Sequence, residues 1–169
     1  MCIRDRGMTI FWCDNALIEN NTFDLITIAT GAQTGLAVSG GTGVSAMNIM
    51  VRNNSINRYW VNNSGSIATQ INGMSIVGDN LLCLSNKVAN MRGVSTSVST
   101  TTGVMMSTSP VFGINHSSGT GSRIYNNTVN MYGAPMNSST TLCYSGAAYN
   151  GSSFANGSDV RNNIFINKM

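Results

Sequence analysis

One short unit returns five times along this chain of 169 residues, and it constrains the fold more than any other feature. Each copy contains a pair of polar residues, usually Asn-Asn, between two apolar positions. The second member of the pair is Asn in every copy: Asn21, Asn54, Asn86, Asn127 and Asn163. The intervals between these residues are 33, 32, 41 and 36 positions. Such a drifting interval predicts strands of constant length that are joined by loops of variable length.

The residues around each pair alternate in character. Two positions before the first member stand Ile18, Val51, Cys83, Ile124 and Val160. Three positions after it stand Phe23, Ile56, Val88, Val129 and Phe165. Both positions are apolar in every copy, whereas the positions beside the pair are mixed. Alternation with a period of two indicates strands that bury one face, since a helix would need apolar residues three and four positions apart.

The invariant second Asn falls on the face that the apolar positions predict to be buried. A buried amide without a hydrogen-bond partner costs a few kcal/mol. Parallel strands lie about 4.8 Å apart, so an Asn in each layer of a stack can hydrogen-bond to those above and below. We therefore predict that the five residues form an inward, structural Asn ladder. Asn also tolerates left-handed backbone conformations, which suits a turn between two strands.

A second, weaker unit lies between the copies of the first. It consists of Gly followed by apolar residues, at Gly35–Val38, Gly73–Ile76 and Gly103–Met106. This unit predicts another strand in each layer. Stretches rich in Ser, Thr and Gly, such as 95–102 and 115–122, are predicted to be exposed turns and loops.

Together, the Ile-x-Asn-Asn-Thr units and the Gly-apolar-x-apolar units resemble the right-handed parallel β-helix repeat, the superfold of the pectate lyases. The resemblance spans about residues 15 to 167. The copies at Arg123–Val129 and Asp159–Phe165 are similar to long secreted proteins of Bacteroidota, which implies an extracellular or cell-surface location. We expect an all-β parallel β-helix, a solenoid of about five coils.

The chain ends give the expected domain limits. Residues Met1–Arg6 resemble translated sequencing-adapter sequence, so they are excluded and the β-helix domain is expected to cover 7–169. The chain stops at the end of a repeat strand, and a repeat stack needs polar caps. We therefore expect a fragment that is truncated at both ends and lacks its signal and sorting segments.

Composition narrows the classes of partner. Only 9% of the residues are charged, the formal net charge is +3, and the basic residues form no run. This argues against nucleic acid as a partner, because phosphate binding needs clustered Lys and Arg. No apolar stretch is long enough for a membrane-spanning helix. The hydrophobic fraction of 42% is too high for a disordered polar chain.

No residue pattern predicts catalysis, a metal site or a cofactor. A calcium site needs six to eight oxygen ligands, but the acidic residues beyond the adapter-like segment are scattered: Asp14, Glu19, Asp24, Asp79 and Asp159. The single histidine, His116, is predicted to lie in a Ser/Gly loop. Two pairs of opposite charges, Glu19 with Arg52 and Arg123 with Asp159, are expected to stack as outward neighbours in adjacent coils.

The strongest remaining binding feature is a set of aromatic residues. Tyr59 and Tyr132 lie six positions after the first member of their pairs, and Trp60 follows Tyr59. Aromatic rings stack on sugars, so these three residues are candidate glycan contacts. The interpretation we favour for their side chains is packing beneath a neighbouring loop. We predict a non-catalytic structural or interaction segment that is adhesive or binds a polysaccharide or cell-surface glycan. The alternative is a fragment of a polysaccharide lyase or glycoside hydrolase whose active-site coils are missing.

Overall fold

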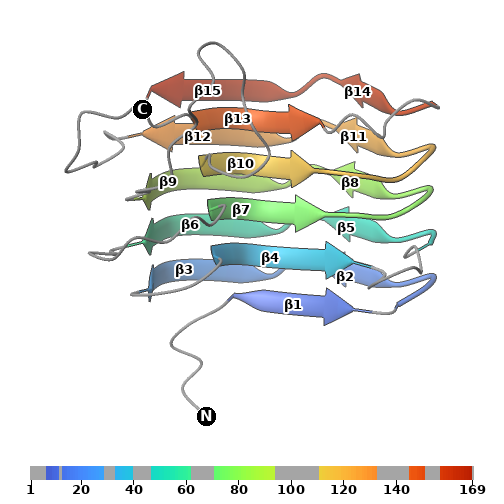
Figure 1. The fold of residues 1–169 in the computed structure, drawn as a ribbon, viewed down its shortest axis with the longest axis horizontal. Coiled ribbons are helices and arrows are strands. Elements are labelled where there is room, and N and C mark those ends of the chain that lie inside the picture. The colour runs from blue at the N-terminus through green and yellow to red at the C-terminus, as the bar shows by residue number, and fades with distance from the viewer. Residues whose placement is uncertain are drawn as a thin grey trace, which may run out of the picture.

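The structure is a computed structural model, and it describes residues 7–11, 13–28, 33–39, 47–61, 71–93, 111–132, 145–150 and 157–168. Every helix or strand within these ranges is a β-strand, and the strands form three parallel sheets of five. The chain passes through the three sheets in turn and then begins again in the next layer (Figure 1). The molecule is therefore an all-β parallel β-helix of five coils, which confirms the predicted fold class.

Each sheet collects the equivalent strand of every coil. The first sheet contains β1 (Met8–Phe11), β4 (Gln33–Ser39), β7 (Ile71–Ile76), β10 (Val111–His116) and β13 (Ser145–Asn150). The second contains the short strands β2 (Leu17–Glu19), β5 (Met50–Arg52), β8 (Leu82–Leu84), β11 (Arg123–Tyr125) and β14 (Asp159–Arg161). The third contains β3 (Thr22–Ile28), β6 (Ser55–Val61), β9 (Lys87–Gly93), β12 (Thr128–Tyr132) and β15 (Ile164–Lys168).

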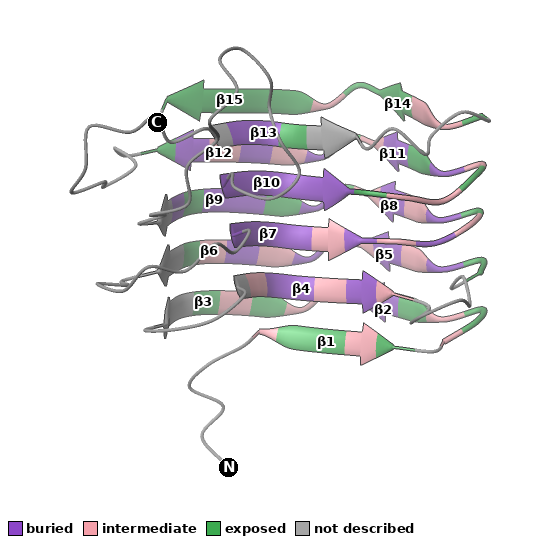
Figure 2. Cartoon of the chain, in the orientation of Figure 1, coloured by how far each residue is buried: buried purple, intermediate pink, exposed green. Residues whose placement is uncertain are grey.

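The core consists of the predicted apolar columns. The register stacks Ile18, Val51, Cys83, Ile124 and Val160 in the second sheet. It stacks Phe23, Ile56, Val88, Val129 and Phe165 in the third sheet. The middle coils bury these side chains almost completely, and burial is lost at the last coil (Figure 2). Each coil therefore depends on its neighbours to cover its apolar face.

The Asn ladder forms as predicted. Each side-chain amide donates from Nδ2 to Oδ1 of the next ladder residue, at 2.9–3.0 Å for the four steps from Asn21 to Asn163. The backbone N–H of the lower residue donates to the same oxygen at 2.8–3.1 Å. The amide also reaches the coil below, as in the 2.9 Å bond from Asn86 Nδ2 to Val51 O. The ladder thereby satisfies amides that the core would otherwise leave unpaired.

The turn between the second and third sheets is formed by the residue before each ladder Asn. These residues have left-handed φ angles of 54–58°, and they are Asn20, Asn53, Ser85, Asn126 and Asn162. Asn enters this conformation more readily than other non-glycine residues, so four of the five positions are Asn. The two polar positions of the repeat thus have separate roles, because the first turns the chain and the second joins the coils.

A column of small residues brings the first sheet close to the third. The register places Gly35 beside Gly73 and Gly73 beside Gly113. A Cβ added at Gly73 would lie 2.4 Å from Val88 Cγ1 and 2.7 Å from the Gly113 carbonyl oxygen. At Gly113 it would lie 2.2 Å from Val129 Cγ1. Glycine is required here because a side chain has no room between a β-branched residue and the next coil.

This register corrects one prediction about the glycine strands. Gly35–Val38 and Gly73–Ile76 lie in β4 and β7 as expected, with Leu36 opposite Met74. The equivalent strand of the fourth coil is β10, whose Ile114 pairs with Met74. Gly113 therefore takes the place predicted for Gly103, and Gly103–Met106 lies outside the described residues. The sequence of β10 ends in Asn-His, which hid its similarity to the apolar strands.

We expect the substitution Gly73→Ala to lower the free energy of unfolding by about 1–3 kcal/mol, because its methyl group overpacks the contact with Val88. Chemical denaturation followed by circular dichroism measures this change. Ser75→Ala in the same strand is the matched control, since Ser75 is only half buried, and it should change stability by less than about 0.5 kcal/mol. Equal losses in the two variants would contradict the close approach at Gly73.

We expect Asn86→Ala to lower the free energy of unfolding by about 2–4 kcal/mol, because it leaves the donors of Asn54 and the acceptor of Asn127 without their ladder partner. Asn21→Ala at the first rung is the matched control. Its amide is half buried, and its oxygen accepts no hydrogen bond from another described residue. A smaller loss for Asn21→Ala in the same denaturation assay supports the ladder, and a loss equal to that of Asn86→Ala would contradict it.

Candidate functional site

The described residues offer little for catalysis or metal binding. Within them, no three His, Cys, Asp or Glu side chains gather where they could hold one metal ion. The core thiol of Cys83 is fully buried, and this burial raises its pKa to about 12, so the thiol stays protonated at neutral pH. No helix in the described segments is long and apolar enough to cross a membrane. The absence of catalytic residues, metal and cofactor stays a prediction.

His116 does not lie in a loop, which corrects its predicted place. It is the last residue of β10 and continues the column of Ile10, Val38 and Ile76. Its side chain is fully buried. The preceding Asn115 is buried as well, so the predicted loop over 115–122 begins only after β10. The Ser/Gly-rich residues that follow His116 suggested a loop, whereas register with the coil below determines its burial.

Burial has a direct effect on the ionisation of His116. The pKa of the imidazole falls from 6.5 to about 4, chiefly because the core disfavours the charged form. The ring is therefore neutral at pH 7. Its place among apolar side chains supports a structural role.

The three predicted glycan contacts do not form one column. Trp60 pairs with Arg92 and Asn57 with Ala89, which places Tyr59 beside Met91. The next step shifts register after Asn130, so Met91 lies opposite Met131. Tyr132 therefore lies one position beyond this column and pairs with Lys168.

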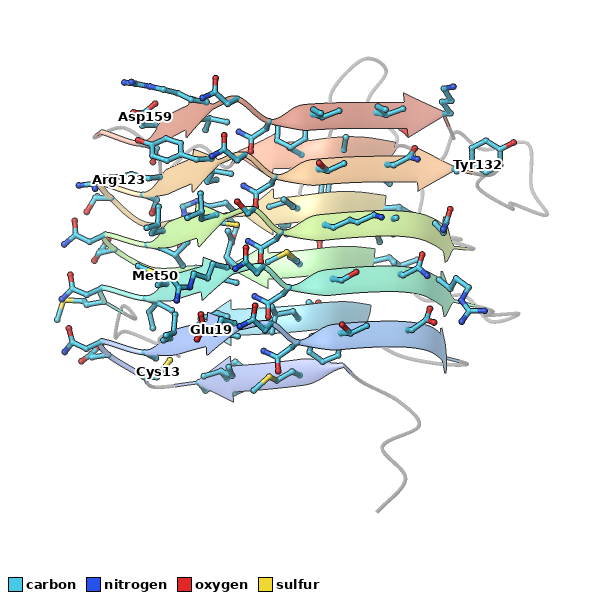
Figure 3. The ribbon with its side chains drawn as sticks, turned by 180° about the vertical axis from the view of Figure 1, so that it is seen from behind. Cys13, Glu19, Met50, Arg123, Tyr132 and Asp159 are labelled. Carbon is cyan, nitrogen blue, oxygen red and sulfur yellow. The ribbon has the colours of Figure 1, made fainter. Side chains whose placement is uncertain are left out.

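A bulge explains the shift. Asn90 is the additional residue of β9, and its φ of 54° is left-handed. Tyr132 is 65% exposed at the end of β12 (Figure 3). The side chains of Tyr59 and Trp60 lie outside the described residues, although their backbones belong to β6. The role of these three residues as glycan contacts stays a prediction.

A different surface feature lies on the outer side of the second sheet. It is a hollow of about 360 Å³ that spans three coils. Its wall comes from the turn before each short strand and from the first residue of that strand. The lining residues are Asn48, Ile49, Met50, Asn80, Leu81, Leu82, Gly121 and Arg123. We call this feature the second-sheet hollow.

The lining combines three kinds of group. Ile49 and Leu81 are fully buried and form its inner side, while Met50 and Leu82 are half buried and pair across adjacent strands. The exposed guanidinium of Arg123 follows Leu82 in the next coil (Figure 3). The hollow therefore presents apolar surface and a cation beside the polar turn.

The polar part of the hollow is a second set of stacked amides. Asn48 Nδ2 donates to Asn15 Oδ1 at 3.2 Å, and Asn80 Nδ2 donates to Asn48 Oδ1 at 3.4 Å. In the next coil, a Cβ added at Gly121 would lie 2.7 Å from Asn80 Oδ1. Glycine at this position therefore leaves the Asn80 amide accessible from the hollow.

A sequence signal for this turn exists but was missed. Six positions before each ladder Asn stands a residue with left-handed φ of 51–86°: Asn15, Asn48, Asn80, Gly121 and Gly157. Asn and Gly are the residue types that tolerate this conformation best. The recurrence of Asn or Gly six positions before each ladder Asn predicts a turn there. It also predicts the stacked amides that line the hollow.

Charged residues beside the hollow form an ordered outer face. Arg52 Nη2 lies 2.6 Å from Glu19 Oε2, which confirms the predicted stacked pair. Arg123 lies opposite Asp159 as predicted, but the ion pair of Asp159 is with Arg161, at 2.7 Å. Asp159 also accepts a 2.8 Å hydrogen bond from the Tyr125 hydroxyl. This bond and the Arg161 guanidinium lower the pKa of Asp159, so the carboxylate stays charged.

The hydrogen bond to Asp159 has a further effect on Tyr125. It raises the pKa of the Tyr125 hydroxyl and fixes its direction. Tyr125 is half buried and projects from the same face as Arg123, because the two residues are two positions apart in β11. The outer face of the second sheet thus combines an oriented aromatic ring, a guanidinium and the amide-lined hollow.

Comparisons with protein-family models, with curated proteins and with solved structures returned no match for this sequence.

We expect the free energy of unfolding to fall as the pH drops from about 6.5 to about 4, because His116 binds a proton more readily in the unfolded chain. The stabilisation of the folded state by neutral His116 is fully present above pH 6.5. It is lost as the pH approaches the folded pKa of about 4. At about 1.4 kcal/mol per pKa unit, this shift amounts to roughly 3 kcal/mol. Urea denaturation across this pH range measures the slope. The free energy of unfolding of the His116→Leu variant should depend less on pH. An equal slope in the variant and the wild type would contradict the low pKa of His116.

Proposed function

We propose that this chain is a non-catalytic interaction segment of a secreted or cell-surface bacterial β-helix protein, of the kind found in Bacteroidota, and that it binds polysaccharide. The observation that carries this proposal is the second-sheet hollow, in which amides, apolar side chains and Arg123 converge on one open surface. Small-molecule sites combine apolar walls with a few placed polar groups in this way.

The lining suits the chemistry of a sugar. The Asn48 and Asn80 amides can donate to and accept from hydroxyl groups, and the apolar flank of Met50 and Leu82 suits the C–H face of a pyranose ring. Arg123 adds a donor that favours carboxylate or hydroxyl oxygens. Tyr125 extends this surface with an aromatic ring.

The repeat favours a polymer over a single sugar. Coils repeat about every 4.8 Å, so equivalent positions of successive coils lie along one line on the outer face. The lining residues come from three consecutive coils. A linear polysaccharide presents its own groups at regular intervals and can contact several coils at once, which raises its apparent affinity.

We expect the purified chain to be retarded in native gels that contain a polysaccharide, tested with a uronate polymer, a neutral glucan and a mannan. For any polymer that retards the chain, Arg123→Ala should raise the dissociation constant about tenfold, because it removes a charge-assisted hydrogen bond at the hollow. Retardation at several polymer concentrations gives the dissociation constant. If none of the three polymers retards the wild-type chain, the proposal is wrong.

Two controls locate the surface. Lys87→Ala removes an exposed cation from the third sheet and should leave retardation unchanged. A triple substitution of Tyr59, Trp60 and Tyr132 by Ala tests the predicted aromatic contacts. If this variant loses binding while Arg123→Ala retains it, binding belongs to the third sheet and not to the second-sheet hollow. Far-ultraviolet circular dichroism should confirm that every variant keeps its strands.

A further inference from the structure

The stacked amides at the turn before the second sheet are interrupted after Asn80. Asn48 donates from Nδ2 to Asn15 Oδ1, and Asn80 donates from Nδ2 to Asn48 Oδ1. Each side-chain oxygen of this set therefore faces the next coil and accepts from the Asn that stands there. The next coil has Gly121 at this position, and no described residue donates to Asn80 Oδ1. This acceptor is left open within the second-sheet hollow.

The backbone at Gly121 keeps the shape of the turn but lacks the group that would bond to Asn80. A Cβ added at Gly121 would lie 2.7 Å from Asn80 Oδ1 and 3.8 Å from Asn80 Cγ, so the oxygen is the part of the amide that faces this place. The φ angle of Gly121 is 66°, close to the 51° of Asn80 and the 55° of Asn48. What is missing is only the side chain of an Asn, which is an acetamide group.

We propose that the second-sheet hollow prefers sugars that carry an acetamido group, as N-acetylhexosamines do, so that the ligand supplies the amide that Gly121 lacks. The N–H of the acetamido group donates to Asn80 Oδ1 in the place of an Asn Nδ2. This preference rests on the proposed polysaccharide binding, and it names the class of sugar that binds most tightly.

Arg123 provides donors for the carbonyl oxygen of the same acetamido group. It lines the hollow two residues after Gly121, and its side chain is exposed. The other three arginines whose side chains the structure describes each form an ion pair with a carboxylate. Arg123 forms none with a described residue, so its guanidinium is available to a ligand. A hydrogen bond from this charged donor is stronger than one between neutral groups.

The methyl end of the acetamido group suits the apolar part of the lining. Ile49 and Leu81 form the inner side of the hollow, while Met50 and Leu82 keep part of their surface exposed. Contact with a methyl group removes apolar surface from water on both partners. An acetamido group therefore matches all three kinds of lining group, because it offers an N–H, a carbonyl oxygen and a methyl.

Other substituents of a sugar match fewer of these groups. A hydroxyl can donate to Asn80 Oδ1, but it brings no carbonyl oxygen for Arg123 and no methyl. A carboxylate can pair with Arg123, but it has no hydrogen to donate to Asn80 Oδ1. A protonated amino group can donate to Asn80 Oδ1, but its positive charge is repelled by Arg123.

The test compares three oligosaccharides that differ only in the group at one ring carbon, namely the linear hexamers of N-acetylglucosamine, glucosamine and glucose. Isothermal titration calorimetry with the full chain of 169 residues gives their dissociation constants. The N-acetylated hexamer should bind about tenfold more tightly than the glucose hexamer, because it adds a hydrogen bond from a charged donor and the contacts of a methyl group. The glucosamine hexamer should bind most weakly of the three.

The substitution Gly121→Asn builds the missing amide into the chain. Its Nδ2 should donate to Asn80 Oδ1, whose flexible side chain can shift to admit the new Cβ. The N-acetylated and glucose hexamers should then bind this variant with equal dissociation constants. Gly157→Asn is the matched control, because it makes the same change one coil further on, at a left-handed φ of 86° and with nothing within 4 Å of an added Cβ. It should keep the preference of the wild type.

Saturation-transfer NMR on the wild-type chain is a second measurement that needs no variant. The acetyl methyl protons of the N-acetylated hexamer should receive more saturation than its ring protons, and the reverse order would overturn the preference. Equal binding of the N-acetylated and glucose hexamers would also overturn it but would leave polysaccharide binding standing, whereas binding of neither would overturn both. A preference that persists in folded Gly121→Asn would show that the open Asn80 acceptor is not its cause.

Discussion

Every coil of this β-helix depends on one polar constraint, the need to satisfy an amide group within an apolar core. A stack of coils meets this need with the same residue at the same position, because the oxygen of each ladder Asn from Asn54 onward accepts two hydrogen bonds from the coil below. An apolar residue at this position would leave the neighbouring backbone N–H without an acceptor. The ladder therefore fixes the register of the second and third sheets, and the apolar columns follow from that register.

The same solution recurs at other positions with less burial. Asn15, Asn48 and Asn80 are joined by their side-chain amides at the turn before the second sheet. On the outside of the third sheet, Asn90 donates to Asn57 at 2.8 Å and Asn57 donates to Asp24 at 3.0 Å. Stacked amides thus explain a chain with only 9% charged residues, because contact between coils supplies the polar partners that water or ion pairs supply in other proteins.

The sequence predicts this fold well because its strongest signals repeat. Five copies of one unit align without gaps over the ladder and its two apolar columns, and the structure confirms all three. The errors concern features that occur once. The register of the third sheet shifts at one step, between β9 and β12, so Tyr132 does not align with Tyr59. His116 replaces an apolar residue in its column, so the last two residues of its strand fell within the predicted loop over 115–122.

The candidate site was harder to predict for a related reason. The second-sheet hollow depends on Gly121, which replaces the Asn found at the same position in the three earlier coils, and on Arg123, which follows Met50 and Leu82 in one column. These are differences between coils, and alignment of the repeat emphasises what the coils share. The glycine column likewise depends on a close approach between the first and third sheets, which no spacing along the chain reveals.

The bulge at Asn90 also divides the solenoid into two blocks. The third-sheet strands β3, β6 and β9 pair without a shift, as do β12 and β15, and register changes only between β9 and β12 among the described strands. Duplication or loss of a whole coil within either block would therefore preserve strand register. The same event across the boundary would move the end of the third sheet by one residue. The coils are thus interchangeable units within each block but not between blocks, which limits how recombination can lengthen or shorten such a chain.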